Sequence, residues 1–171
     1  MESFLLWIGC LPFYFISVIG AWLIASIAPL FAKEYSLKDT WLNWCTTPGT
    51  NLLGDKAHQE RFKNKNKYFQ QVWWIIRNPA VNFQRDILGI PWKDTDQVIT
   101  KGNEKAQFEG GSCFQRIVRN NKTIAWMVFS CISYPWFKDK AFRLLLGWKT
   151  WDKGKKNPLQ FAFRITFWKS F

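Results

Sequence analysis

Few residues of this 171-residue chain have the types and spacing that catalysis requires. His58 is the only histidine, and Asp94 and Asp96 lie two positions apart beside Lys93. Paired carboxylates can hold a cation or exchange protons with a substrate, but two aspartates in a polar loop are usually solvated. We therefore expect a solvated pair at Asp94 and Asp96. At His58 we expect a surface histidine in the first turn of a helix.

The cysteines do not have the spacing of a metal site. None of them forms a C-x-x-C pair or stands beside the histidine, as a zinc site would require. The four are Cys10, Cys45, Cys113 and Cys131. We expect reduced, mostly buried thiols. The sequence also has no phosphate-binding loop, dinucleotide fingerprint or nucleophile elbow. It predicts no metal, no cofactor and a protein that is not an enzyme.

The N-terminal segment is the strongest signal in the chain. Residues 4–32 carry no charged side chain, and the run is bounded by Glu2 and Lys33. About 20 apolar residues suffice for a helix to cross the hydrocarbon core of a bilayer. We predict a membrane anchor over residues 1–32. Because proline is tolerated best in a first turn, the spanning helix should begin near Leu11. Residues 4–10, Trp7 included, should lie at the membrane interface or form a kinked extension of the helix.

Two other interpretations of this run are weaker. A signal peptide has a basic start and an apolar region of about 7–15 residues, whereas this chain starts Met1-Glu2-Ser3 and its run is longer. A buried core helix would need surroundings that cover an apolar cylinder on every side. We expect an uncleaved anchor.

The charge distribution predicts an orientation. All 24 Lys and Arg residues follow residue 32, and the net charge is +12. Lys33 and Lys38 flank the end of the run, so the positive-inside rule places the C-terminal part in the cytoplasm and the N-terminus outside. Basic residues next to a bilayer attract anionic lipid headgroups, which we therefore expect as a partner.

Residues 33–55 are predicted to form a juxtamembrane stalk and turn. Trp41 and Trp44 are three positions apart, which places them on one face if the segment is helical. They suit either the membrane interface or packing against the domain. Asp55 is suited to cap the helix that follows.

Residues 56–171 are predicted to form a basic α+β domain with helices within 56–89 and strands within 112–168. One amphipathic helix is expected from Lys56 to about Arg77, and a shorter helix should follow over residues 80–88. Basic residues crowd the first half of the longer helix: Arg61, Lys63, Lys65 and Lys67. This helix could lie on a membrane or pack its apolar stripe into the domain, which we favour. The polar segment 93–109 is expected to be a loop or weak hairpin.

The last third of the chain alternates apolar and polar residues, as half-buried strands do. Strands are predicted at 113–119, 123–133, 142–151 and 159–168, with a turn at Asn120-Asn121. They would form an antiparallel four-strand meander. The apolar run 124–137 is short for a membrane span, so we expect a strand there. The fold class is α+β with an N-terminal transmembrane helix.

Several short motifs resemble an uncharacterised family of small tailed-bacteriophage membrane-associated proteins. They are Trp41-Leu42-Asn43-Trp44, Thr47-Pro48, Gly54-Asp55, the stretch from Trp73 to Pro79, Leu88-Gly89 and Gly147-Trp148-Lys149. Gly49 occupies a position that is usually acidic in that family, which argues against a cation site in this turn. The resemblance covers nearly the whole chain. It implies a phage origin and an accessory role at the host membrane, with no established activity.

These observations favour a single-span protein of the host inner membrane that acts by binding a host or phage protein. A virion component with a buried apolar N-terminus is one alternative. A nucleic-acid-binding protein is another, because stacking aromatics over a basic groove bind single strands. A lysis protein that permeabilises the membrane is a further possibility.

Overall fold

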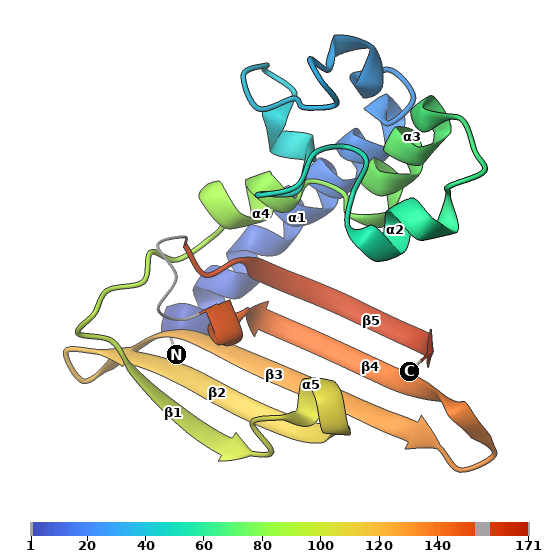
Figure 1. The fold of residues 1–171 in the computed structure, drawn as a ribbon. Coiled ribbons are helices and arrows are strands. Elements are labelled where there is room, and N and C mark those ends of the chain that lie inside the picture. Colours follow the sequence, from blue (N-terminus) through green and yellow to red (C-terminus); the bar gives the residue numbers. More distant parts are fainter. Residues whose placement is uncertain (1, 153–157, 171) are drawn as a thin grey trace. The chain divides into compact units, whose positions relative to one another are not determined.

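The computed structural model describes residues 2–152 and 158–170 and has an α+β fold (Figure 1). The α-helices are α1 (Glu2–Ile24), α2 (Lys56–Arg61), α3 (Lys67–Arg77), α4 (Val81–Asp86) and α5 (Ala106–Glu109). Three 3-10 helices are η1 (Ala28–Phe31), η2 (Asn43–Cys45) and η3 (Thr150–Asp152). The predicted fold class is confirmed at this level. Residues 153–157, between the predicted strands 142–151 and 159–168, lie outside the described residues.

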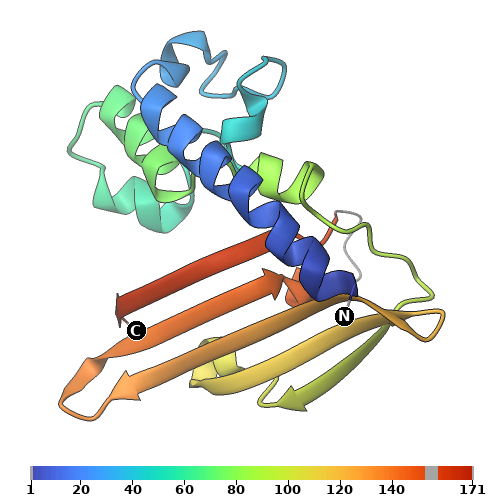
Figure 2. The ribbon, with the colours of Figure 1, turned by 180° about the vertical axis from the view of Figure 1, so that it is seen from behind.

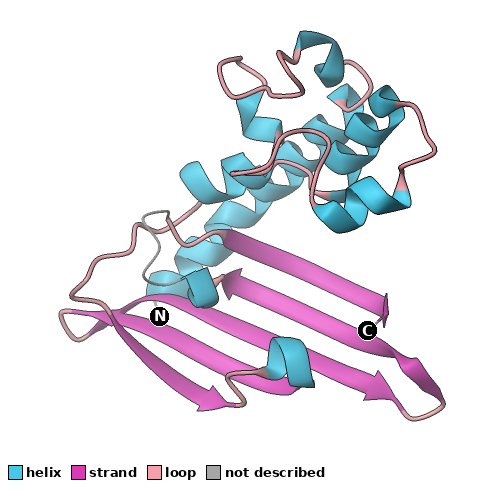
Figure 3. Ribbon diagram, in the orientation of Figure 1, coloured by secondary structure: helices cyan, strands magenta, loops and turns pink. Residues whose placement is uncertain are grey.

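One antiparallel sheet contains all the strands, which follow each other in chain order (Figure 3). They are β1 (Gln97–Gly102), β2 (Gly111–Arg119), β3 (Lys122–Tyr134), β4 (Phe137–Trp148) and β5 (Phe161–Ser170). The predicted turn at Asn120-Asn121 is confirmed, with positive φ at both residues, as tight hairpin turns require. The apolar run 124–137 also forms a strand, as predicted.

The prediction of four strands is wrong, because β1 adds a fifth at the edge of the sheet. It pairs with β2 from Gln97↔Val118 to Gly102↔Cys113. This segment is polar and mostly exposed, so its sequence lacks the alternation that marks a half-buried strand. The helix α5 lies in the same stretch, where a loop was expected.

The sheet has a closed face and an open face. On the closed face, α5 and Trp151 pack against a buried cluster that includes Met127, Phe129 and Leu145. Residues on the opposite face include Phe114, Val128 and Leu146, which occupy one cross-strand row. The first turns of α1 lie on this second face, as the view from behind shows (Figure 2).

The backbone conformation of β4 at position 147 requires glycine. Its φ is +101°, and a Cβ there would stand 2.0 Å from the carbonyl oxygen of Trp126. Only glycine adopts this conformation without strain. The glycine therefore lets β4 pass close to β3 beneath the Trp126 ring.

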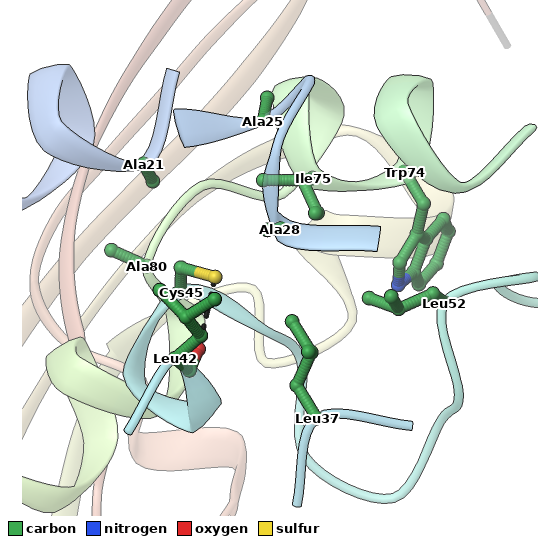
Figure 4. Packing of buried hydrophobic residues seen from close by; sticks show 10 residues of the cluster. All are labelled: Ala21, Ala25, Ala28, Leu37, Leu42, Cys45, Leu52, Trp74, Ile75 and Ala80. Carbon is green, nitrogen blue, oxygen red and sulfur yellow. Dashed lines mark hydrogen bonds between the residues drawn. The ribbon is translucent and has the colours of Figure 1, made fainter. Parts of the chain in front are cut away.

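A second hydrophobic core lies among the helices. It joins the end of α1 and η1 to α3 through small and large residues in contact (Figure 4). Its buried members are Ala21, Ala25, Ala28, Leu37, Leu42, Cys45, Leu52, Trp74, Ile75 and Ala80. Gly54 fits against the ring of Trp74, where a Cβ would stand 2.5 Å away, and its φ is +78°.

The chain forms two compact units whose bounds differ from the predicted segments. One unit contains residues 1–9 with residues 89–171, and the other contains residues 10–88. The segment 33–55, expected to be a stalk, supplies Leu37, Leu42 and Leu52 to the helical core. Residues 1–9 pack on the C-terminal sheet, although they are far from it in the sequence.

Candidate membrane-binding surface

The outward face of α1 consists of large apolar side chains. Leu23 is 74% exposed and Ile16 is 68% exposed. The outward face is defined by Leu5, Ile8, Ile16, Ile19 and Leu23, all exposed and spaced three, four, seven or eight positions apart, as one face of a helix requires. Burying such a side chain away from water is worth about 1.5–3 kcal/mol, so this surface is suited to a non-aqueous neighbour.

The inward face of α1 includes small and polar residues. Ser3, Ser17 and Ala21 are buried, and Ser17 Oγ donates a hydrogen bond to the Tyr14 carbonyl. The face continues through Ala25 into η1. In a helix of a water-soluble protein the apolar face packs on the core and the polar face meets water. In α1 the inward face buries Trp7 and Val18 together with the two serines, and large apolar side chains also cover the exposed face.

The helix is continuous through Pro12 and starts at Glu2, so residues 4–10 form a helical extension, one of the two predicted possibilities. Proline removes one backbone hydrogen bond, and α1 nevertheless continues to Ile24. Its length and hydropathy allow it to cross a membrane, and among residues 2–152 and 158–170 it is the one helix with that property.

Trp7 was predicted at the membrane interface, but it is buried against the sheet. Its ring centroid lies 5.3 Å from that of Trp126 and 5.9 Å from that of Phe161. Its indole nitrogen donates a hydrogen bond to the Ala162 carbonyl at 3.3 Å. The polar atom of the side chain is thus satisfied by protein, and Trp7 belongs to the core that holds the start of α1.

Two basic residues lie beside the start of α1. Lys101 and Arg116 line a groove of about 720 Å³ on the open face of the sheet, together with Ser3 and Phe4. Neither residue was predicted to belong to a binding surface, because residue 101 fell in an expected loop. The alternation of β2 could have placed Arg116 on the face of Phe114, but no sequence signal brings residues 1–9 to that face.

The end of α1 is followed by the other predicted interface residues. Lys33 and Lys38 are exposed. Trp41 is 73% exposed and contacts Phe31 edge to face, with ring centroids 6.5 Å apart. These three positions remain available to a membrane.

Trp44 is packed in the protein whereas Trp41 is exposed, so the prediction that both lie on one helix face is wrong. Trp44 lies within η2 and packs against the helical core. Its ring tip lies 3.3 Å from the place where a Cβ on Gly20 would stand. Trp41 precedes η2 and stays outside the core. A short 3-10 helix does not hold the two rings in the α-helical spacing that the prediction assumed.

The predicted basic amphipathic helix is interrupted. Arg61 ends α2, Lys63 and Lys65 lie in the following turn, and Lys67 begins α3. Asn66 causes the restart, because its side chain accepts a hydrogen bond from the Tyr68 amide at 2.8 Å and so caps a new helix. The four basic residues are exposed, but they do not share one helix face.

The predicted apolar stripe of α3 packs into the domain only in part, so the packing that we favoured is wrong for Phe69 and Trp73. Both side chains are exposed, whereas the neighbouring Trp74 and Ile75 pack in the core. Trp22 of α1 donates a hydrogen bond to the Ile76 carbonyl at 3.1 Å. This bond joins the end of α1 to α3.

Asp55 caps α2, as predicted. Its Oδ1 accepts a hydrogen bond from the His58 amide at 2.8 Å. The prediction of a surface histidine is wrong, because His58 is buried between Phe62 and Trp74. Its Nε2 lies 2.9 Å from the Gln70 carbonyl oxygen. The one histidine thus packs inside the helical unit.

The two aspartates do not converge. Asp94 is exposed, whereas the side chain of Asp96 is fully buried. Arg119 donates two hydrogen bonds to Asp96, at 2.6 and 2.7 Å, and the Lys93 amide donates a third. The hydrogen bonds from Arg119 hold the pKa of Asp96 below its ordinary value. The expectation of a solvated pair is therefore wrong for Asp96, which stabilises the start of β1.

Three of the four cysteines are buried, and none of the four forms a disulfide within the described residues. Burial raises the pKa of the Cys45 thiol to about 12, so this residue is not a nucleophile at neutral pH. In the described part of the chain no group of three or more His, Cys, Asp or Glu side chains could hold a metal ion.

A polar pocket of about 390 Å³ is lined by residues 46–52 together with Asn43 and Asn82. The Asn82 amide nitrogen donates to the Asn43 carbonyl and to Thr46 Oγ1, both at 2.9 Å. The Asn82 backbone amide also donates to the Thr46 carbonyl at 2.8 Å. These bonds join the segment after Trp41 to α4. Among the described residues that line the pocket, none is acidic.

Comparison with known proteins identifies a family and no function. No curated protein matches the chain, and no solved structure matches it. The profile of one family of unknown function, DUF7338, matches residues 1–171. The chain therefore belongs to family DUF7338.

Proposed function

We propose that this DUF7338 protein is attached to a membrane through the outward face of α1 and acts there by binding rather than by catalysis. The observation that carries the proposal is the large apolar surface that α1 leaves exposed. Large apolar side chains such as Ile16 and Leu23 point outward along the helix. In water this arrangement would expose apolar surface on most of the helix, whereas hydrocarbon stabilises it.

Exposed basic and aromatic residues support the same role. Lys33, Lys38 and Trp41 follow the apolar segment and are exposed. Each Lys or Arg near an anionic bilayer surface contributes about 1 kcal/mol, and tryptophan is favoured at the boundary of hydrocarbon and water. We propose anionic phospholipid as the first partner.

The biological setting is proposed from the motif resemblance alone. It supports a phage-encoded accessory protein of the host inner membrane, with a host or phage protein as its second partner. The open sheet face, with exposed Phe114 and Ile165, is available for such a partner.

Fractionation of the full chain tests attachment. We expect the protein to stay with membranes after a carbonate wash. The double variant Ile16→Lys with Leu23→Lys should move into the soluble fraction, because lysine costs about 2.5–3.5 kcal/mol in the middle of a bilayer and less near its surface. Phe108→Lys is the matched control, since Phe108 is 78% exposed on α5 and should remain with membranes. Release of the unmodified chain by carbonate would contradict the proposal.

A virion component is the second candidate, because the outward face of α1 could also be covered by neighbouring protein subunits. Mass spectrometry of purified particles separates the two roles. Membrane attachment predicts that the protein is absent from particles or present in traces. Stoichiometric presence would favour the virion role.

A further inference from the structure

We propose that α1 lies along one leaflet of the membrane and does not cross it. This inference rests on the proposed membrane attachment and gives the topology of the same surface. It differs from the single-span topology that the sequence predicts, with the N-terminus outside and the C-terminal part in the cytoplasm.

The packing of residues 2–9 provides the main argument. Trp7 contacts Trp126, Phe161 and Phe163 and donates a hydrogen bond to Ala162. The start of the chain and the C-terminal sheet are therefore parts of one compact unit. A compact unit of this kind stands on one side of a bilayer, so the chain crosses the membrane an even number of times.

The number of candidate spans then decides between zero and two crossings. Across residues 2–152 and 158–170, α1 is the one helix long and apolar enough to cross. The other long apolar run, residues 124–137, forms β3 in the middle of the sheet. A second crossing has no segment to make it, and zero crossings remain.

The pattern of burial along α1 agrees with this conclusion. Trp7, Ser17 and Ala21 are buried along one side of the helix, whereas its large outward side chains are exposed. A helix lying in the interface needs only one apolar face, buried about 5–10 Å deep. The outward face of α1 supplies it.

Basic residues beside the start of α1 fit an anionic leaflet. Lys101 and Arg116 line the groove at the start of the helix. A helix that crosses with its N-terminus outside should have cations near its cytoplasmic end alone. Cations near the start of α1 suit a helix whose N-terminal end lies beside anionic headgroups.

Protease protection in bacterial spheroplasts tests the topology. The full chain carries one epitope tag at each end, and protease is added outside the intact inner membrane. A helix in one leaflet predicts that the two tags share the same fate, protected before lysis and digested after it. Digestion of the N-terminal tag with protection of the C-terminal tag would show a single crossing and overturn this inference. Membrane attachment would still stand in that case.

The same samples show whether the proposed attachment itself fails. A separate portion of the same spheroplasts is lysed and its membranes are washed with carbonate, and recovery of the tagged chain in the soluble fraction would overturn the proposed function together with this inference. The two failures are therefore distinguishable.

Flotation with vesicles tests the contact at the start of α1. The vesicles contain phosphatidylcholine with or without phosphatidylglycerol. We expect Lys101→Gln with Arg116→Gln to lower binding to the anionic vesicles several-fold and to leave binding to neutral vesicles unchanged. Lys105→Gln with Arg164→Gln removes the same charge from the closed face of the sheet and should change binding less than twofold. Equal losses for both pairs would overturn the inference.

Discussion

The sheet and the helix α1 differ in which side chains they bury and which they leave exposed. The closed face of the sheet buries Met127, Phe129 and Leu145, as a protein in water does. The inward face of α1 buries Trp7, Ser17 and Ala21, and the helix leaves many large apolar side chains exposed. The sheet therefore has an ordinary hydrophobic core, whereas much of the apolar surface of α1 is not covered by the described part of the protein.

Replacing Trp7 should have the largest effect on folding. Trp7→Ala removes a buried indole from the aromatic cluster on the sheet, which costs about 3–5 kcal/mol of unfolding free energy. Leu5→Ala is the matched outward change two positions earlier and should cost less than about 0.5 kcal/mol. Denaturant titration of the detergent-solubilised chain measures both. Equal destabilisation would mean that the two faces of α1 are packed alike.

The small residues of the inward face should resist enlargement. Ala21 is fully buried in the helical core, so Ala21→Leu should destabilise that core by about 1–3 kcal/mol through overpacking. Leu23→Ala makes the reverse substitution, leucine to alanine, on the outward face. In detergent it should leave the unfolding transition nearly unchanged. A destabilised Leu23→Ala variant together with a stable Ala21→Leu variant would reverse the assignment of the two faces.

The two aspartates offer a smaller test in the sheet unit. Asp96→Asn removes a charged acceptor of Arg119 and should cost about 1.5–3 kcal/mol, while Asp94→Asn at the exposed site should be nearly neutral. Because the pKa of Asp96 lies below its ordinary value of about 3.9, the stability that it provides is present above about pH 4. It is lost as the pH falls through the lowered pKa.

Unfolding measured between pH 7 and pH 3 checks this prediction. The unmodified chain should lose the contribution of Asp96 on acidification, and the Asp96→Asn variant should lack that part of the pH dependence. The same loss in both chains would show that Asp96 is not its source.

Local patterns in the sequence predicted most of the sheet. Strict alternation marked β5, the Asn120-Asn121 turn marked the β2–β3 hairpin, and Asp55 marked the start of α2. The edge strand β1 was missed because both of its faces are largely exposed, which leaves no apolar alternation to detect. The break at Asn66 was missed because a capping asparagine also fits a polar position inside a helix.

The surface around α1 was only partly predictable. Its apolar character follows from residues 4–32, and the recurrence of Ser3, Trp7, Tyr14, Ser17 and Ala21 at intervals that fit one helix face could have revealed the inward face. The contact between Trp7 and Phe161 could not be predicted, because it joins the two ends of the chain. A single span was predicted because an uncharged run is followed by the basic part of the chain. The contact between Trp7 and Phe161 argues against that topology.

Photocrosslinking from the outward face tests the central claim most directly. Benzoylphenylalanine is placed at Ile16 or Leu23 in the full chain, and Phe108 serves as the control position. Irradiation of intact membranes should give phospholipid adducts, seen as a mass increase, from Ile16 and Leu23 but not from Phe108. Adducts to protein alone at both outward positions, or an equal lipid yield from Phe108, would contradict the account.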